Sequence, residues 1–308
     1  MRLRSESLSI FEKAVILKLT IGHPGNSAKL GKDKYEVKSG TADESAEAKE
    51  KAKARTRAEK KLLEAPEIDE ASAALEKTRI RIRKIANDSP LGAGSHLISI
   101  VAVPKAEEII KEALDRLETV HKPKIADLYP QRIAEAKRDL NGLFDPTDYA
   151  PLDDFLRKFY IDQMYLAFGA PAALASVGLL EREETRINEA AMATADAIPL
   201  NLATEMQELT KRLIARTSKS ASGEKTKFKG LLDNYLEFLT NLPLRNILDS
   251  DELREVGEKA QSILAGVTSE ALIENTRIRD YVENEMSGIA TKLDTIINLR
   301  PTRAFEAA

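Results

Sequence analysis

The chain has 308 residues, of which 43% are hydrophobic and 31% charged, and its formal net charge is −3. This composition excludes a wholly disordered protein, which needs low hydrophobicity and a large net charge, and so small a charge does not by itself favour nucleic acid. The absence of cysteine excludes disulfides and thiolate chemistry and suits a cytoplasmic protein. Because no apolar run reaches about 18 residues, we predict no membrane-spanning helix and no membrane partner.

The N-terminal segment favours β-structure. Residues Ala14–Ile21 form a β-leaning run, which is followed by turn residues as far as Asn26. This run predicts a strand, and an amphipathic helix over Leu8–Leu19 is the alternative. A second extended segment is predicted at Lys34–Lys38 and a charged helix over Asp43–Leu63.

The next predicted helix, Ile68–Ala86, carries a heptad seam. Its apolar positions recur at alternating spacings of 3 and 4, at Ile68, Ala71, Leu75, Thr78, Ile82 and Ile85. Such a seam is typical of a coiled coil or of a helical hairpin within one chain. We favour the hairpin, because about three heptads is the lower limit for a coiled coil.

A loop and a second strand follow this helix. The loop is predicted at Asn87–Ser95 and the strand at His96–Val103. Pro104 suits the first turn of the next helix, where its missing N–H costs nothing. Pro123 and Pro130 are expected to kink or divide the continuation of that helix, since each removes an intrahelical hydrogen bond.

The middle of the chain contains the predicted domain boundary. A turn-rich junction at Leu143–Leu152 divides the chain into residues 1–142, with the β element and long helices, and residues 143–308, a compact helical bundle. Beyond it, the segment Asp153–Phe168 contains five Phe and Tyr residues. We predict that this segment is a hub of the core, because large aromatic side chains dominate the burial of apolar surface.

The last part of the chain is helical by pattern. A helix is predicted over Glu181–Arg216, with Pro199 as a candidate interruption, and a polar loop over Thr217–Thr226. Three further helices are expected: one with an apolar stripe from Phe228 to Leu242 that ends at Pro243, one from about Asp249 to Gly266, and a last one capped by Ser269. The predicted fold is therefore mainly α, an elongated helical hairpin plus a helical bundle, with a small N-terminal β element.

No complete catalytic, nucleotide-binding or metal-binding motif is recognisable. Residues Gly223–Thr226 match only the end of a phosphate-binding loop, whose first glycine is missing here. The three histidines, His23, His96 and His121, are too far apart for the usual spacing of zinc ligands. The acidic pairs lie where helix N-termini are expected, and capping explains them. We predict no catalytic residues, no metal and no cofactor.

Two basic patches are candidate nucleic-acid contacts. Their residues are Arg79, Arg81, Arg83, Lys84, Lys225, Lys227 and Lys229. Lysines and arginines grouped in this way neutralise phosphates and give salt-dependent binding, although a solvated helix face is the alternative interpretation. Convergence of the two patches on one surface would favour nucleic acid, whereas their dispersal would favour a protein adaptor.

Diffuse leucine and aromatic patterns occupy Tyr129–Phe155 and Phe228–Gly266. In these stretches the chain resembles a family of phage and bacterial proteins that is known only as a domain of unknown function. The resemblance implies genes near those of MoxR-like AAA ATPases and von Willebrand A-type proteins, and it implies no catalytic residues.

Two hypotheses for the function follow. The first is a non-enzymatic interaction protein that self-associates as a homo-oligomer and acts as an adaptor in a phage or bacterial assembly, with an AAA ATPase as a candidate partner. The alternative is a nucleic-acid-binding accessory protein that contacts phosphates through the basic residues named above. A third, enzymatic hypothesis requires three or more acids or histidines gathered in one cleft.

Overall fold

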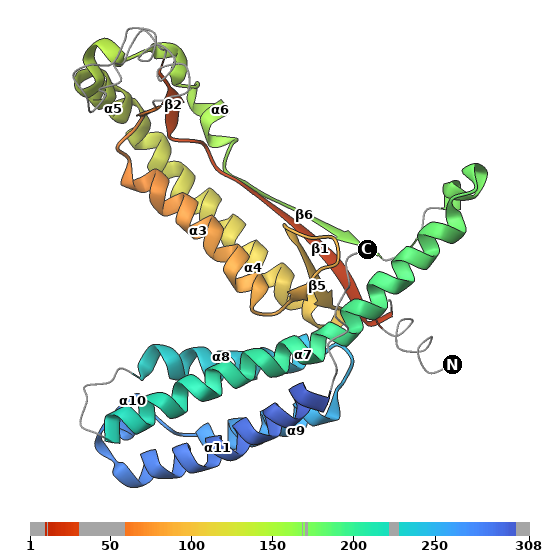
Figure 1. The fold of residues 1–308 in the computed structure, drawn as a ribbon. Coiled ribbons are helices and arrows are strands. Elements are labelled where there is room, and N and C mark those ends of the chain that lie inside the picture. The colour runs from red at the N-terminus through yellow and green to blue at the C-terminus, as the bar shows by residue number, and fades with distance from the viewer. Residues whose placement is uncertain are drawn as a thin grey trace, which may run out of the picture. The chain divides into compact units, whose positions relative to one another are not determined.

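The fold is mainly α with a small antiparallel sheet, as predicted (Figure 1). The computed structural model describes residue 10 and residues 12–30, 59–167, 169, 172–221 and 228–299. Within these residues, no helix is both long and apolar enough to cross a membrane.

The described α-helices are α3 (Pro66–Arg83), α4 (Val103–Arg116), α5 (Lys122–Leu140), α6 (Leu152–Leu156), α7 (Leu180–Ala221), α8 (Lys229–Arg245), α9 (Asp251–Leu264), α10 (Ser269–Glu274) and α11 (Thr276–Leu299). The strands are β1 (Ala14–Gly22), β2 (Ser27–Lys29), β3 (Glu59–Lys61), β4 (Asn87–Asp88), β5 (Ser95–Ser99) and β6 (Tyr160–Leu166). They form a four-stranded sheet in the order β4-β5-β1-β6 and a separate β2-β3 pair.

The chain folds into two compact units, each made of separated segments. The bundle unit takes its described residues from 1–19, 80–107 and 163–308, and the hairpin unit takes them from 20–79 and 108–162. The chain therefore passes from one unit to the other after residues 19, 79, 107 and 162, whereas the sequence predicted one division after residue 142.

The N-terminal strand is confirmed, and its main partner is the second predicted strand. In β1, Ala14 to Lys18 pair antiparallel with Ser99 to Ser95 of β5. The alternative helix over Leu8–Leu19 is wrong, because from Ala14 onward these residues are in the sheet. Strand β5 ends at Ser99, earlier than predicted, and a short 3-10 turn then leads into α4.

Two other N-terminal predictions have different outcomes. The extended segment at Lys34–Lys38 lies outside the described residues, as does most of the helix predicted over Asp43–Leu63. The described end of that helix is wrong, because Glu59–Lys61 forms β3 and pairs with β2. A short strand of charged residues carries no periodic signal that would reveal it.

The six residues of the predicted seam are at most 3% exposed, and five of them lie on α3, which ends at Arg83 and not at the predicted Ala86. In the hairpin unit, Ile68, Ala71 and Leu75 belong to one core cluster with Leu117 and Tyr129, which lie on the helix that returns antiparallel to α3. This is the predicted hairpin (Figure 1). Leucine-sized side chains buried in this way contribute about 1.5–3 kcal/mol each before entropy is counted.

The prolines disturb the second arm of the hairpin less than predicted. Helix α5 continues through Pro130, so a division there is wrong. The irregularity lies before Pro123, where Leu117–His121 form one π-helical turn. A π turn bonds each N–H one residue further back, and it places Pro123 in the first turn of α5, where the missing N–H has no intrahelical partner to lose.

A buried ion pair ties the two arms together. Glu67 in the first turn of α3 is only 3% exposed. Arg132 of α5 donates from Nε to Glu67 Oε1 at 2.8 Å and from Nη2 to Oε2 at 3.1 Å, and its Nη1 donates to Glu135 at 2.9 Å. The bond from Arg132 lowers the pKa of Glu67. This geometry makes the pair specific to one register of the hairpin.

Helices α7, α8, α9 and α11 form the core of the bundle unit. Met206 on α7, Leu253 on α9 and Met286 on α11 are fully buried. Tyr235 of α8 is buried too, and its hydroxyl shares a hydrogen bond of 2.6 Å with that of Thr210. These two hydroxyl groups are therefore paired, which avoids the cost of leaving either one unsatisfied in the core.

Three details of the predicted bundle helices are corrected. Helix α7 runs through Pro199 without interruption and continues to Ala221, into the predicted polar loop. Helix α8 ends at Arg245, beyond Pro243. The last predicted helix is two helices: Thr268 caps α10, and the side chain of Asn275 then accepts from the N–H groups that begin α11.

The aromatic hub is confirmed in its first half only. Phe155 and Phe159 are buried, at 7% and 1% exposure, and Phe155 stacks on Tyr129 with 4.7 Å between ring centroids. The second half is strand β6, in which Tyr160 is 45% exposed. A Cβ atom at Gly22 of β1 would collide with the ring of Tyr160, so glycine is needed for this close approach.

The hairpin unit contains a buried histidine, and for this reason we expect the stability of the unit to depend on pH. His121 is 9% exposed and its Nε2 has no hydrogen-bond partner. Burial lowers the pKa of His121, Arg116 and Lys124 lower it further, and Glu70 opposes them. The unfolded chain therefore binds more protons than the folded chain once the pH falls below about 6.5, and stability is lost as the pH falls from there toward the folded-state pKa.

We expect His121→Asn to reduce this loss between about pH 7 and pH 5, measured by urea unfolding at several pH values. The matched control is His23→Asn, which replaces an exposed histidine of the same unit. An unaltered slope in His121→Asn would show that another group titrates in this range. Protonation of Glu67 is separable, because its lowered pKa confines its effect to pH values below about 4.5.

Candidate functional site

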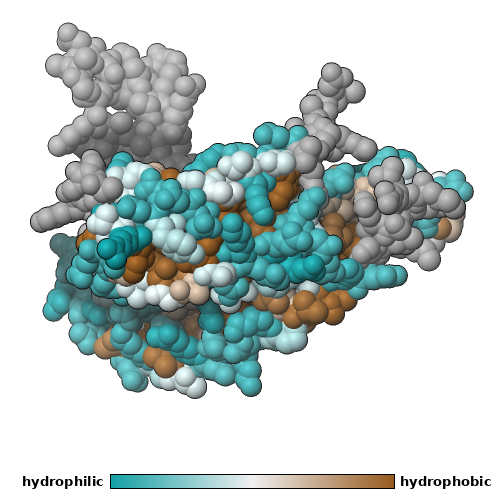
Figure 2. Space-filling model, turned by 90° about the horizontal axis from the view of Figure 1, so that it is seen from below, coloured by the Kyte–Doolittle hydropathy of each residue, from teal (hydrophilic) through white to brown (hydrophobic). Residues whose placement is uncertain are grey.

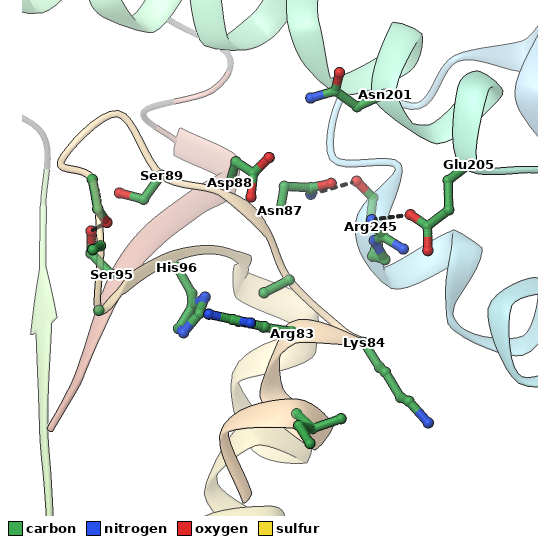
Figure 3. Close-up of a pocket in the computed structure, with 15 residues that line it drawn as sticks. Arg83, Lys84, Asn87, Asp88, Ser89, Ser95, His96, Asn201, Glu205 and Arg245 are labelled. Atoms are coloured by element: carbon green, nitrogen blue, oxygen red, sulfur yellow. Dashed lines mark hydrogen bonds and ion pairs between the residues drawn. The ribbon is translucent and has the colours of Figure 1, made fainter. Parts of the chain in front are cut away.

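The bundle unit contains a cavity of about 670 Å³ (Figure 3). It lies among the C-terminal end of α3, the segment from β4 to β5, and residues on α7 and α8. Most of its lining residues have polar or charged side chains, and they include three of the chain's basic residues, Arg83, Lys84 and Arg245. A volume of this size is typical of small-molecule sites, whose specificity comes from a few placed polar groups.

Two glycines shape the loop that forms one wall. Gly92 and Gly94 have φ values of 79° and 80°, a conformation that other residues adopt only with strain. The loop is closed by Ser95, whose Oγ donates to the Gly92 carbonyl at 2.6 Å. The Gly94 carbonyl accepts from Leu19 N–H of β1 at 3.0 Å, which fixes the loop to the sheet. The predicted loop at Asn87–Ser95 is thus confirmed, apart from the two residues of β4 and Ser95, which begins β5.

Asn87 connects the short strand β4 to the end of α8. Its side chain is 8% exposed, and its Nδ2 donates to the backbone carbonyl of Arg245 at 2.8 Å. The last carbonyls of a helix have no intrahelical partner, so Asn87 satisfies one of them. This bond holds the loop wall and the helix wall of the cavity together.

Arg245 is neutralised by a neighbouring helix. Its Nη2 lies 2.7 Å from Glu205 of α7, and its guanidinium lies over the ring of Phe238 at 5.6 Å from the centroid. Its Nε is buried without a hydrogen-bond partner. The side chain is only 12% exposed, so it acts as a wall of the cavity and not as a free charge.

The predicted basic residues of the first patch differ in burial and in ion pairing. Arg79 is partly buried, with Nη2 3.7 Å from Glu76, and Arg81 is half-buried. Lys84 lies 2.6 Å from Glu237 of α8. Arg83 is exposed, lines the cavity, and makes no ion pair with any part of the chain that the structure describes.

The second predicted patch does not join the first within the described residues. Lys225 and Lys227 lie outside them. Lys229 is exposed at the start of α8, and Asp233 and Glu237 follow it at intervals of four residues on the same exposed side of that helix. These two carboxylates stand between Lys229 and Lys84 over about 12 Å of helix. A nucleic-acid backbone that ran from Lys229 to Lys84 would meet these two carboxylates midway, and their negative charge would repel its phosphates. The basic residues described are therefore dispersed.

Across residue 10 and the ranges 12–30, 59–167, 169, 172–221 and 228–299, no three acidic or histidine residues gather as metal ligands. Comparisons with family models, with curated proteins and with solved structures each find no match. The interpretation of the cavity therefore depends on its own geometry.

Sequence reasoning identified Arg83 and Lys84 but missed Asn87, Glu205 and Arg245. The Asn87–Arg245 bond joins residues 158 positions apart, and nothing in their local sequence marks either one. The loop glycines were recognised as turn residues, which is correct, but a turn signal does not reveal what the turn faces.

We expect Asn87→Ala to destabilise the bundle unit by about 1–2 kcal/mol, because it leaves the Arg245 carbonyl without its partner in a buried setting. Asp88→Ala is the matched control, since Asp88 is the exposed neighbour on the same strand and should change stability by less than about 0.5 kcal/mol. Urea unfolding of both variants tests this. Equal effects of the two substitutions would contradict the structural role of Asn87.

Proposed function

We propose that this chain is a non-enzymatic helical interaction protein that self-associates and acts as an adaptor. The observation that carries the proposal is the N-terminal arm of α7, residues 180–190. Ten consecutive residues of this helix, 181–190, contain no buried position, whereas Ala191 begins its contribution to the bundle core. In Figure 1 this end of α7 reaches past α8, α9 and α11.

The arm has the features of a surface that binds another helix. Leu180 and Ile187 are half-buried and stand seven residues apart, so they occupy one side of the helix. Around them the arm carries four glutamates and two arginines. Glu183 pairs with Arg182 at 3.1 Å and with Arg186 at 3.3 Å.

Mixed charge makes the arm complementary to a second copy of itself. Exposed ion pairs within one helix contribute only about 0.3–0.5 kcal/mol, so they can be exchanged for pairs between helices at little cost. An antiparallel second arm would place its arginines near these glutamates while the apolar positions meet. Apolar contacts would supply affinity and charges would set the register.

The dispersed basic residues favour this proposal over the nucleic-acid alternative. Of the cations described, Lys84 is neutralised, Arg79 is partly buried beside Glu76, and acidic residues separate Lys229 from Lys84. On the face drawn in Figure 2, hydrophobic residues show in narrow strips and small groups among hydrophilic ones, without a broad apolar area. A projecting helix is therefore a more suitable contact element than that face.

The kind of assembly in which the adaptor would act is inferred from the family resemblance of Tyr129–Phe155 and Phe228–Gly266. It favours a phage or bacterial assembly, with an AAA ATPase as a candidate partner. Self-association is the part of the proposal that the chain itself can test.

We expect size-exclusion chromatography with light scattering to give a mass at least twice the chain's 34.0 kDa. The double variant Leu180→Glu and Ile187→Glu should shift the protein toward monomer while its helical circular dichroism is kept, because it places charge at the apolar contact. The matched control is Ile273→Glu with Tyr281→Glu, two exposed apolar residues elsewhere in the bundle unit.

Monomeric wild-type protein at every concentration would refute self-association. An oligomer that survives the arm variant would place the interface elsewhere. Loss of the oligomer in both double variants would mean that added charge, and not the arm, is responsible.

A further inference from the structure

We propose that the cavity of the bundle unit binds a small phosphorylated molecule, with Arg83 holding the phosphate. This inference goes beyond the adaptor function and does not depend on it. It is carried by Arg83, which is the one arginine or lysine of the lining that has no ion pair within the described residues, together with backbone donors of the loop that lines the same cavity.

The pairing of the lining residues singles out Arg83. Arg245 pairs with Glu205 at 2.7 Å and Lys84 with Glu237 at 2.6 Å. Arg83 makes no ion pair or hydrogen bond to the described residues, and it lines the cavity. In Figure 3 its side chain points toward His96 and the loop wall, while Lys84 points away from the cavity. An arginine fork in this state is available for an oxyanion.

The loop supplies further donors. The N–H groups of Gly92 and Ser95 are used inside the loop, by the carbonyls of Ser89 and Gly92. The consecutive N–H groups of Ala93 and Gly94 make no such bond to other described residues, and both residues line the cavity. Successive free amides flanked by glycines in the left-handed conformation are a recurrent way to bind anions.

The number of donors favours phosphate over carboxylate. The guanidinium and two successive amides offer more hydrogen bonds than the two oxygens of a carboxylate use well, whereas a phosphomonoester presents three oxygens and about two negative charges. A phosphate also neutralises Arg83 more completely than a single negative charge does. The shared chemistry is therefore a terminal phosphate group.

The rest of the lining limits what the phosphate is attached to. Asp88 and Asn201 line the cavity, and neither side chain is engaged by another described residue. In Figure 3 Asp88 and Asn201 lie above Arg83. A carboxylate there would repel a second anion but would accept hydrogen bonds from hydroxyl or amino groups. The ligand class that fits is a phosphorylated sugar or a nucleoside monophosphate.

The test is isothermal titration of the full chain with inorganic phosphate, ribose 5-phosphate and adenosine 5′-monophosphate, beside ribose, adenosine and glutamate. We expect the phosphorylated sugar compounds to bind and their unphosphorylated counterparts and glutamate not to bind. Arg83→Gln should weaken binding about tenfold or more, and Arg83→Lys should weaken it less.

Lys292→Gln is the matched control, because Lys292 is an exposed cation of the bundle unit that does not line the cavity, and it should change affinity less than about twofold. Asp88→Asn should leave inorganic phosphate unaffected or better bound while weakening the sugar phosphates. Circular dichroism and unfolding midpoints confirm that each variant is folded.

Several outcomes would overturn the proposal. These are no binding by any phosphorylated probe, equal binding in Arg83→Gln and wild type, or equal binding of glutamate. Tighter binding of a DNA duplex than of the monophosphates, with the same dependence on Arg83, would replace the cavity site with a nucleic-acid surface. None of these results changes the mass measured for the arm variants, so failure of this site and failure of the adaptor proposal are distinguishable.

Discussion

The bundle unit depends on the packing of one helix, α7, against α8, α9 and α11. From Ala191 to Leu213 it places seven residues in the core, at Ala191, Ala195, Ile198, Leu202, Ala203, Met206 and Leu213. The small residues among them let the neighbouring helices approach closely, and the larger ones fill the space between. Loss of this contact would expose the apolar sides of α8, α9 and α11 together, since each of these helices buries its apolar residues in the same core.

The same helix also positions the candidate site. Successive residues of an α-helix are rotated by about 100°, so neighbouring positions face different surroundings. Leu202 and Met206 are fully buried, whereas Asn201 and Glu205 line the cavity and Glu205 holds Arg245. Core packing thus sets the position of the cavity wall. The arm at residues 180–190 continues the same helix without a break, because Pro199 is accommodated inside it.

Local patterns predicted the helices well, since a helix that buries one side must repeat its apolar residues with the helical period. The seam of α3 and the stripe of α8 are examples, and all of the seam residues are buried. Strand β6 escaped prediction because two of its three exposed positions, Tyr160 and Met164, are apolar, while its covered positions include Gln163, which donates to Glu107. A strand whose polarity does not alternate cannot be distinguished from a hydrophobic hub by sequence alone.

The candidate site shows why charge patterns predict less than apolar patterns do. Arg79, Arg83 and Lys84 look equivalent in the sequence, as members of one basic patch. The availability of each charge is decided by carboxylates that the fold brings in: Glu237 comes to Lys84 from 153 residues away, and Glu76 reaches Arg79 within the same helix. Arg83 has no carboxylate partner among the described residues, and it lies beside the same cavity as the glycine loop. An apolar pattern predicts burial directly, whereas a charge pattern becomes informative only once the partner of each charge is known. For this reason the proposed phosphate site centres on Arg83, a predicted cation that lines the cavity and whose partner the described fold does not supply.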